Sequence, residues 1–302
     1  MSSFRGFILQ ANYRVVTQTS GARVPVIHIY GRLENGDTFL IRDDRQRPQF
    51  YIRATDAERA RALRSPTPLP IDKRAMDGGG VYCIQMDIPS DIPDLRDRLQ
   101  ANGIETFEAD VRFAVRYLIE RGVKGGCEVN ADAVAGQNTK WIFNNPILRP
   151  ADVKLTPRVL SFDIETDAKS ERLLAISLFA PGVDEVLIVD SSARSMPEKA
   201  TRCLNEYDAL ENFCQRIAQF DPDVITGWNI IDFDFSVLER IAKRVRHPFE
   251  FGRDAGAIRI RKAEGYFGSG QATIPGRLVL DGIDLLRGAF VKMDDYSLDA
   301  VA

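Results

Sequence analysis

Three prolines within twelve residues divide the chain into two halves with different patterns. Pro146, Pro150 and Pro157 lie in the segment 144–157, NNPILRPADVKLTP. Proline fixes φ and cannot donate a backbone hydrogen bond, so this segment is typical of a connector and not of a sheet interior. A chain of 302 residues is long enough for two cores. We therefore expect two domains, residues 1–150 and 151–302.

The first half predicts a mixed α/β domain. Alternating apolar residues at 24–33 and 37–42 flank Asn35-Gly36, which indicates a β-hairpin. Further strands are expected at 49–54, 81–88 and 104–111, and a helix at 90–100 with Ser90 or Asp91 as its cap. This β-α-β run indicates a ferredoxin-like or RNA-recognition-like element, although the aromatic signature of base stacking is absent.

The second half predicts three consecutive strands and then alternating helices and strands. The strands are expected at 158–166, 173–179 and 185–190, followed by a helix at 206–220, a buried strand at 223–228, a helix at 235–245, a strand at 277–281 and a helical start at 296. This order is typical of a ribonuclease H-like mixed sheet. The fold class expected for the whole chain is therefore α/β (α+β).

Composition excludes several classes of protein. The chain is 44% hydrophobic and 27% charged, and no apolar run approaches the roughly 20 residues that span a bilayer. The N-terminus lacks a secretory signal, and the four scattered cysteines have no metal-finger spacing, so we expect a cytoplasmic protein. The net charge of −3 argues against a nucleic-acid partner. The acidic excess lies in the second half, however, which is compatible with carboxylates that hold cations.

Asp163 and Glu165 form the first candidate site, at the end of an apolar strand. Residues i and i+2 of a strand share a face, so the two carboxylates project together, which is costly unless a cation neutralises them. The pattern is weak by itself, because about one Asp-x-Glu is expected by chance in 300 residues. Asp56 and Glu58 show the same spacing in a polar stretch where a solvated helix face explains them.

The second candidate site follows the buried strand 223–228. Asn229, Asp232, Phe233 and Asp234 lie where a helix is expected to begin. An acid at a helix start can simply cap free backbone N–H groups. Spacing alone leaves open which aspartate is a ligand. The structural alternatives are a capping amide for Asn229 and a core aromatic for Phe233.

Taken together, these motifs resemble those of family B DNA polymerases. Asp163-Ile164-Glu165 with Thr166 resembles the first exonuclease motif, and Asn229 to Asp234 resembles the second, Asn-x-x-x-Phe-Asp. The sequence most resembles the bacterial polymerase II type. The segments that carry this resemblance occur in the same order along the chain: GFIL, FEADVR, RYLIER, DPDVITGWN, FGRD and GRLVLDGIDLL. The segment 263–277 also resembles a hairpin of these exonuclease domains.

The resemblance implies a two-metal 3′→5′ proofreading site that uses Mg²⁺ or Mn²⁺. Asp163, Glu165 and Asp234 would be the catalytic metal ligands, and Asp232 would be a cap or an outer acid. Thr166, Asn229 and Phe233 would position the 3′ end, and Asp281 is a further candidate near the site. The implied partners are single-stranded 3′ ends and primer-template DNA, the polymerase domains of the same chain and a sliding clamp, in a bacterial, nucleoid-associated setting.

The family pattern also contains a third motif, Tyr-x-x-x-Asp. Tyr296 and Asp299 are one residue too close to form it, so we interpret Asp299 as a structural acid. We therefore expect a truncated chain, with an N-terminal polymerase domain and an incomplete exonuclease domain that has little activity alone. The alternatives are a free-standing DEDD-type exonuclease and a non-catalytic DNA-binding module.

Overall fold

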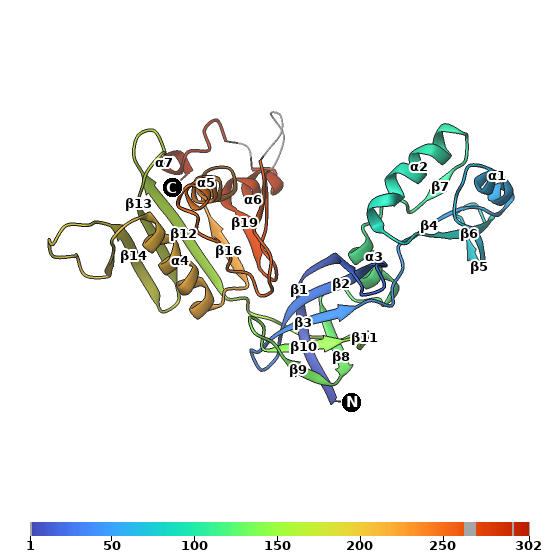
Figure 1. Cartoon of the computed structure of the whole chain (residues 1–302), viewed down its shortest axis with the longest axis horizontal. Coiled ribbons are helices and arrows are strands. Elements are labelled where there is room, and N and C mark those ends of the chain that lie inside the picture. The colour runs from blue at the N-terminus through green and yellow to red at the C-terminus, as the bar shows by residue number, and fades with distance from the viewer. Residues whose placement is uncertain (1, 263–269, 292, 302) are drawn as a thin grey trace. The chain divides into compact units, whose positions relative to one another are not determined.

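The chain forms two compact units, Met1–Leu155 and Thr156–Ala302, in the computed structural model (Figure 1). The structure describes residues 2–262, 270–291 and 293–301. Part of the proline-marked segment belongs to the first unit, because β11 (Ile147–Pro150) pairs with β8 (Gly126–Ala131) at the edge of a sheet. An edge strand tolerates prolines since one of its sides makes no ladder hydrogen bonds.

The larger sheet of the first unit is built around a long hairpin. Its strand order is β11-β8-β1-β2-β3-β10-β9. The remaining strands are β1 (Ser2–Thr17), β2 (Arg23–Leu33), β3 (Thr38–Asp43), β9 (Ala133–Ala135) and β10 (Trp141–Asn144). The predicted hairpin of β2 and β3 is confirmed, and helix α3 (Phe113–Glu120) packs on β1 and β2.

The ferredoxin-like element is the second sheet of this unit. Its chain order is β4 (Gln49–Arg53), α1 (Ala57–Ala62), β5 (Leu69–Arg74), β6 (Gly80–Gln85), α2 (Ile92–Ala101) and β7 (Thr106–Phe107). The spatial order β5-β6-β4-β7 is that of a ferredoxin-like sheet.

Two details of this element differ from the prediction. The strand expected at 104–111 is limited to β7, because Glu108 adopts a left-handed φ of 57° and turns the chain. Asp91 occupies the N-cap of α2 but makes no side-chain capping bond. A short 3₁₀ turn, Pro89–Asp91, leads into α2 instead.

The second unit contains a six-stranded mixed sheet of order β15-β14-β13-β12-β16-β19. Its strands are β12 (Val159–Thr166), β13 (Leu173–Ala180), β14 (Val183–Val189), β15 (Ala200–Cys203), β16 (Val224–Gly227) and β19 (Leu278–Asp281). Strands β12, β16 and β19 are parallel, whereas β12, β13 and β14 are antiparallel. The predicted mixed ribonuclease H-like sheet is confirmed.

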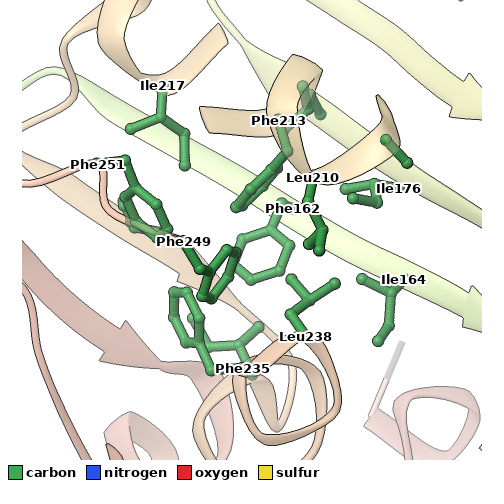
Figure 2. Packing of buried hydrophobic residues seen from close by; sticks show 14 of the residues in the cluster. Phe162, Ile164, Ile176, Leu210, Phe213, Ile217, Phe235, Leu238, Phe249 and Phe251 are labelled. Carbon is green, nitrogen blue, oxygen red and sulfur yellow. The ribbon is translucent and has the colours of Figure 1, made fainter. Parts of the chain in front are cut away.

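Helices α4 (Glu206–Phe220) and α5 (Ser236–Val245) bury one face of this sheet. Figure 2 shows that Phe162 and Ile164 of β12 lie in one hydrophobic cluster with Phe213 of α4 and with Phe235, which directly precedes α5. Alternate residues of β12 point the other way, so Asp163 and Glu165 lie on the exposed face. Helix α6 (Gly282–Gly288) and a small hairpin of β17 (Arg259–Arg261) and β18 (Gln271–Thr273) complete the structure near this sheet, with α7 (Leu298–Val301) toward the C-terminus. Residues 263–269 of the predicted hairpin segment lie outside the described part of the chain.

A buried ion network joins the N-terminal ends of the three parallel strands. The guanidinium of Arg253 donates to Asp221 Oδ1 and to Asp223 Oδ1, each at 2.8 Å, and Arg277 donates to Asp221 Oδ1 at 2.8 Å. Asp223 Oδ2 also accepts the backbone N–H of Arg158 at 2.9 Å. Burial, reinforced by repulsion from Arg253, lowers the pKa of Arg277 to about 10. The network therefore aligns the starts of β12, β16 and β19.

We predict that Arg253→Ala destabilises the second unit by about 3–5 kcal/mol, because the buried carboxylate of Asp223 would lose the guanidinium that pairs with its charge. Urea unfolding followed by the fluorescence of Trp228 measures this loss, in a Trp141→Phe background that leaves one tryptophan.

Arg194→Ala is the matched control. Arg194 pairs with Asp190 at 2.8 Å, but its side chain is 71% exposed, so its loss is expected to cost less than about 1 kcal/mol. Equal losses in the two variants would contradict a dominant role for the buried network.

None of the helices in the described ranges is long and apolar enough to cross a membrane. All four cysteines lie in these ranges and are free thiols.

Candidate active site

Acidic residues gather at the carboxyl ends of the three parallel strands. Asp163 and Glu165 lie near the end of β12, Asp234 lies on the turn that follows β16, and Asp281 is the last residue of β19. Ligand sites of open α/β sheets occur at such strand ends. Residues separated by more than 100 positions are thereby brought to one edge of the sheet.

Strand β12 extends beyond its pairing with β16, which frees a backbone donor. The two strands pair only from Val159–Ser161 to Val224–Thr226, whereas β12 continues to Thr166. The N–H of Ile164 donates instead to Oδ1 of Asp234 at 3.1 Å. The side chain of Asp234 thus takes the place of a strand partner, and Asp234 is only 1% exposed.

Burial and like charge weaken the ionisation of these acids. Burial, followed by repulsion from Asp163, raises the pKa of Asp234 to about 7, and Asp281 contributes a smaller repulsion. Partial burial and then the charge of Glu165 raise the pKa of Asp163. These interactions place Asp163 within electrostatic reach of both Glu165 and Asp234. A cation beside Asp163 would relieve both repulsions.

The backbone after β16 is tightly constrained where it leads to Asp234. A methyl group on Gly227 would lie 2.5 Å from the carbonyl oxygen of Phe162 and 2.2 Å from Cγ2 of Ile230. Asn229 then adopts a left-handed φ of 57°, and Ile230–Phe235 forms a π-helical turn before α5. Such π turns occur frequently at functional sites. This turn directs Asp234 inward and leaves Phe233 37% exposed.

Asp281 secures the same turn from the neighbouring strand. Its carboxylate accepts the backbone N–H groups of Asn229 at 3.2 Å, Ile231 at 3.1 Å and Ile283 at 3.0 Å. The bond from Ile283 also makes Asp281 the N-cap of α6. Helix α6 was not predicted from the sequence, although an aspartate followed by GIDLLRG carries an N-cap signal.

The other predicted positions are placed as follows. Phe233 is exposed, so the alternative of a core aromatic is wrong. The Asn229 side chain makes no capping bond at the π turn, so the alternative of a capping amide is also wrong. The Thr166 hydroxyl donates to the carbonyl of Asp167 at 3.1 Å. Asp232 lies toward the β17–β18 hairpin, because a methyl group on Gly270 would be 2.6 Å from its Oδ1.

Tyr296 and Asp299 lie in the C-terminal segment. The Tyr296 hydroxyl donates to the carbonyl of Val291 at 2.8 Å, and its ring lies 4.9 Å from the guanidinium of Arg287. Asp299 is exposed on α7. The carbonyl of Tyr296 accepts the indole N–H of Trp228 at 2.9 Å, which attaches this segment next to the turn.

The donor set at the strand ends suits a hard cation. Asp163, Glu165 and Asp234 offer only carboxylate oxygens, which favour Mg²⁺ or Mn²⁺ over softer metals. Their mutual repulsion is the observation that fits a divalent ion. Within the described ranges, no three or more aspartate, glutamate, histidine or cysteine side chains lie close enough together to hold a metal ion in this structure.

We predict that Asp234→Asn stabilises the protein above neutral pH when EDTA is present. The folded-state pKa of about 7 exceeds the ordinary value of 3.8, so the stability present below about pH 4 is lost as the pH rises through 7. Asparagine keeps an acceptor for Ile164 without the charge. At pH 8 the gain in unfolding free energy is expected to be on the order of a few kcal/mol.

Urea unfolding from pH 4 to pH 8 measures this difference. Asp232→Asn, which removes the other carboxylate of the same turn, is the matched control. A stability difference for Asp234→Asn that is the same at both ends of the range would contradict the prediction.

Much of the sequence is similar to that of known DNA polymerases. The family model described as DNA polymerase family B, exonuclease domain, matches residues 104–301. DNA polymerase II of Escherichia coli is 32% identical over 226 residues, which are 74% of this chain and 28% of that protein. The DNA polymerase delta catalytic subunit of Schizosaccharomyces pombe is 26% identical over 353 residues, covering 92% of this chain and 32% of the subunit.

The fold is similar to that of a solved DNA polymerase structure. The family B DNA polymerase from the archaeon Pyrobaculum calidifontis matches with a TM-score of 0.73 at 23% identity. The match covers 97% of this chain and 39% of that one. The chain spans about a third of the length of the curated relatives that it matches.

Proposed function

Because the chain belongs to the family of DNA polymerase family B exonuclease domains, we propose that its second unit carries a 3′→5′ exonuclease site that removes nucleotides from the end of a DNA strand. The supporting observation is the gathering of Asp163, Glu165 and Asp234 at the carboxyl ends of β12 and β16. The repulsion between Asp163 and Asp234, which contributes to the raised pKa of Asp234, supports a site built for a cation.

Asp163, Glu165 and Asp234 would hold a pair of Mg²⁺ or Mn²⁺ ions. The bound ions supply an activated water and neutralise charge on the phosphodiester. The chain itself supplies the alignment. The β12 backbone sets the common face of Asp163 and Glu165, and the N–H of Ile164 orients the Asp234 carboxylate.

Three neighbouring residues would position the 3′ end. Phe233 is exposed on the turn that carries Asp234, so its ring is available to stack on a terminal base. Asn229 is exposed with no capping bond to the turn, and its amide can donate to a phosphate or a base. Thr166 lies at the end of β12, next to Glu165.

The whole polypeptide would be a DNA-directed DNA polymerase of the bacterial polymerase II type, in which this site proofreads the primer strand. The 32% identity with the Escherichia coli enzyme supports this type. Residues 1–150 would be the N-terminal polymerase domain, and residues 151–302 the exonuclease domain. Primer-template DNA would be the partner.

We predict that Mn²⁺ binds this chain in a manner that depends on Asp163. Isothermal titration calorimetry of the wild type and Asp163→Ala measures the two affinities. We expect the Mn²⁺ affinity to fall at least about tenfold, since a side chain that would bind the ion directly is removed. Asp56→Ala is the matched control, because Asp56 and Glu58 share the Asp-x-Glu spacing on the first unit. Equal binding by all three proteins would favour a non-catalytic module.

We further predict that, in a polymerase-length protein containing this chain, Asp163→Ala abolishes degradation of a 3′-labelled single strand and leaves nucleotide incorporation largely intact. The physical reason is that the metal ligands act only on the exonuclease reaction. Gel analysis of both reactions with Mg²⁺ measures this separation. Undiminished degradation by the variant would refute the assignment of Asp163.

A further inference from the structure

Asp281 makes more bonds than a helix cap requires. One carboxylate oxygen accepts the N–H groups of Asn229 and Ile283, and the other accepts the N–H of Ile231. A capping aspartate needs only the bond to α6, here from Ile283. The two additional bonds reach across to the turn after β16, which is more than 45 residues away in the sequence.

These two bonds satisfy donors that the turn itself leaves free. The first N–H groups of any helical turn lack partners within the turn. Ile230 is fully buried and Ile231 is 5% exposed, so water does not readily replace a protein acceptor there. Asn229 also holds a left-handed backbone, which persists only when its surroundings fix it.

The position of Asp234 depends on this turn. Asp234 follows Ile231 by three residues, and its carboxylate contacts β12 by accepting the N–H of Ile164. Asp281 is itself 5% exposed and fixed at the end of β19, which is hydrogen-bonded to β16. The neighbouring strand therefore provides a rigid support for the turn.

We propose that Asp281 is a positioning residue of the nuclease site, which holds the Asn229–Ile231 backbone so that Asp234 lies against β12 beside Asp163. This inference rests on the proposed function for its catalytic meaning. The competing role is that of a cap for α6 alone. The two roles differ in their effect on Ile164: only a positioning role predicts that a substitution of Asp281 weakens the hydrogen bond from the Ile164 N–H to Asp234.

Asp281→Ser separates these roles. A serine hydroxyl can cap α6 through Ile283, but its single oxygen on a shorter side chain does not reach the N–H of Ile231. Amide hydrogen exchange of the 302-residue chain, followed by NMR, reports on Ile164 without any metal. We expect the Ile164 amide to exchange roughly tenfold faster or more, while amides that join β12 to β13 keep their protection.

Mn²⁺ titration of the same variant tests the consequence for the site. Loss of a residue that orients metal ligands lowers affinity by about 10–100-fold, although Asp163, Glu165 and Asp234 are all retained. Asp281→Asn, which keeps the side-chain shape and one acceptor, serves as the second variant if Asp281→Ser folds poorly, and a smaller change in both measurements is expected.

Asn205→Ala is the matched control. Asn205 caps α4 by accepting the N–H of Asp208 at 3.0 Å, so its loss removes a cap of the same unit without touching the turn. We expect no selective change at Ile164. Unchanged Ile164 exchange in Asp281→Ser, or unchanged Asp163-dependent Mn²⁺ affinity, would overturn the inference. If the wild type and Asp163→Ala bind Mn²⁺ equally well, the proposed function is refuted instead. The exchange rate of the Ile164 amide would still show whether Asp281 positions Asp234.

Discussion

The buried pairing of Arg253 and Arg277 with Asp221 and Asp223 fixes the starting points of the three parallel strands on which the candidate site is built. Charges this deeply buried stabilise a fold only when every partner is in place. Here backbone carbonyls, among them those of Pro222, Phe251 and Gly276, also accept hydrogen bonds from the two guanidinium groups. The strands are therefore aligned at one end by attraction between opposite charges. Their other ends bring together charges of one sign.

Because opposite charges pair at the strand starts and like charges meet at the strand ends, the sequence motifs contain residues of two kinds, structural and functional. DPDVITGWN, FGRD and GRLVLDGIDLL contribute the four network residues, and the first and last of them also contribute Asn229 and Asp281. Much of the family resemblance in the second unit thus reflects a structural requirement at the strand starts. Asp163 and Asp234 at the strand ends repel each other, and this repulsion together with burial raises the pKa of Asp234. Retention of such unfavourable groups is typical of functional sites.

Periodicity predicted most of the second unit. The helix at 206–220 and the order of strands follow from apolar spacing, and Asp163 and Glu165 share a face because the side chains of a strand alternate between its two faces.

Three features were not predictable from local pattern. The long strand β1 was missed because its half-buried residues give no clear alternation. The bond from Ile164 to Asp234 depends on where β16 stops pairing with β12. The left-handed Asn229 and the bonds of Asp281 arise from contacts between distant segments, so the expected helix start is a π turn instead.

Gly227 shows how a site can depend on a residue that takes no part in its chemistry. Its lack of a side chain allows the Phe162 carbonyl and Ile230 to approach the same point. In a mutational scan scored by nuclease activity, position 227 would therefore tolerate substitutions as poorly as a metal ligand, for steric reasons alone. Scoring the abundance of folded protein in parallel would separate the two cases, because loss of a ligand leaves abundance intact whereas a side chain at position 227 lowers it.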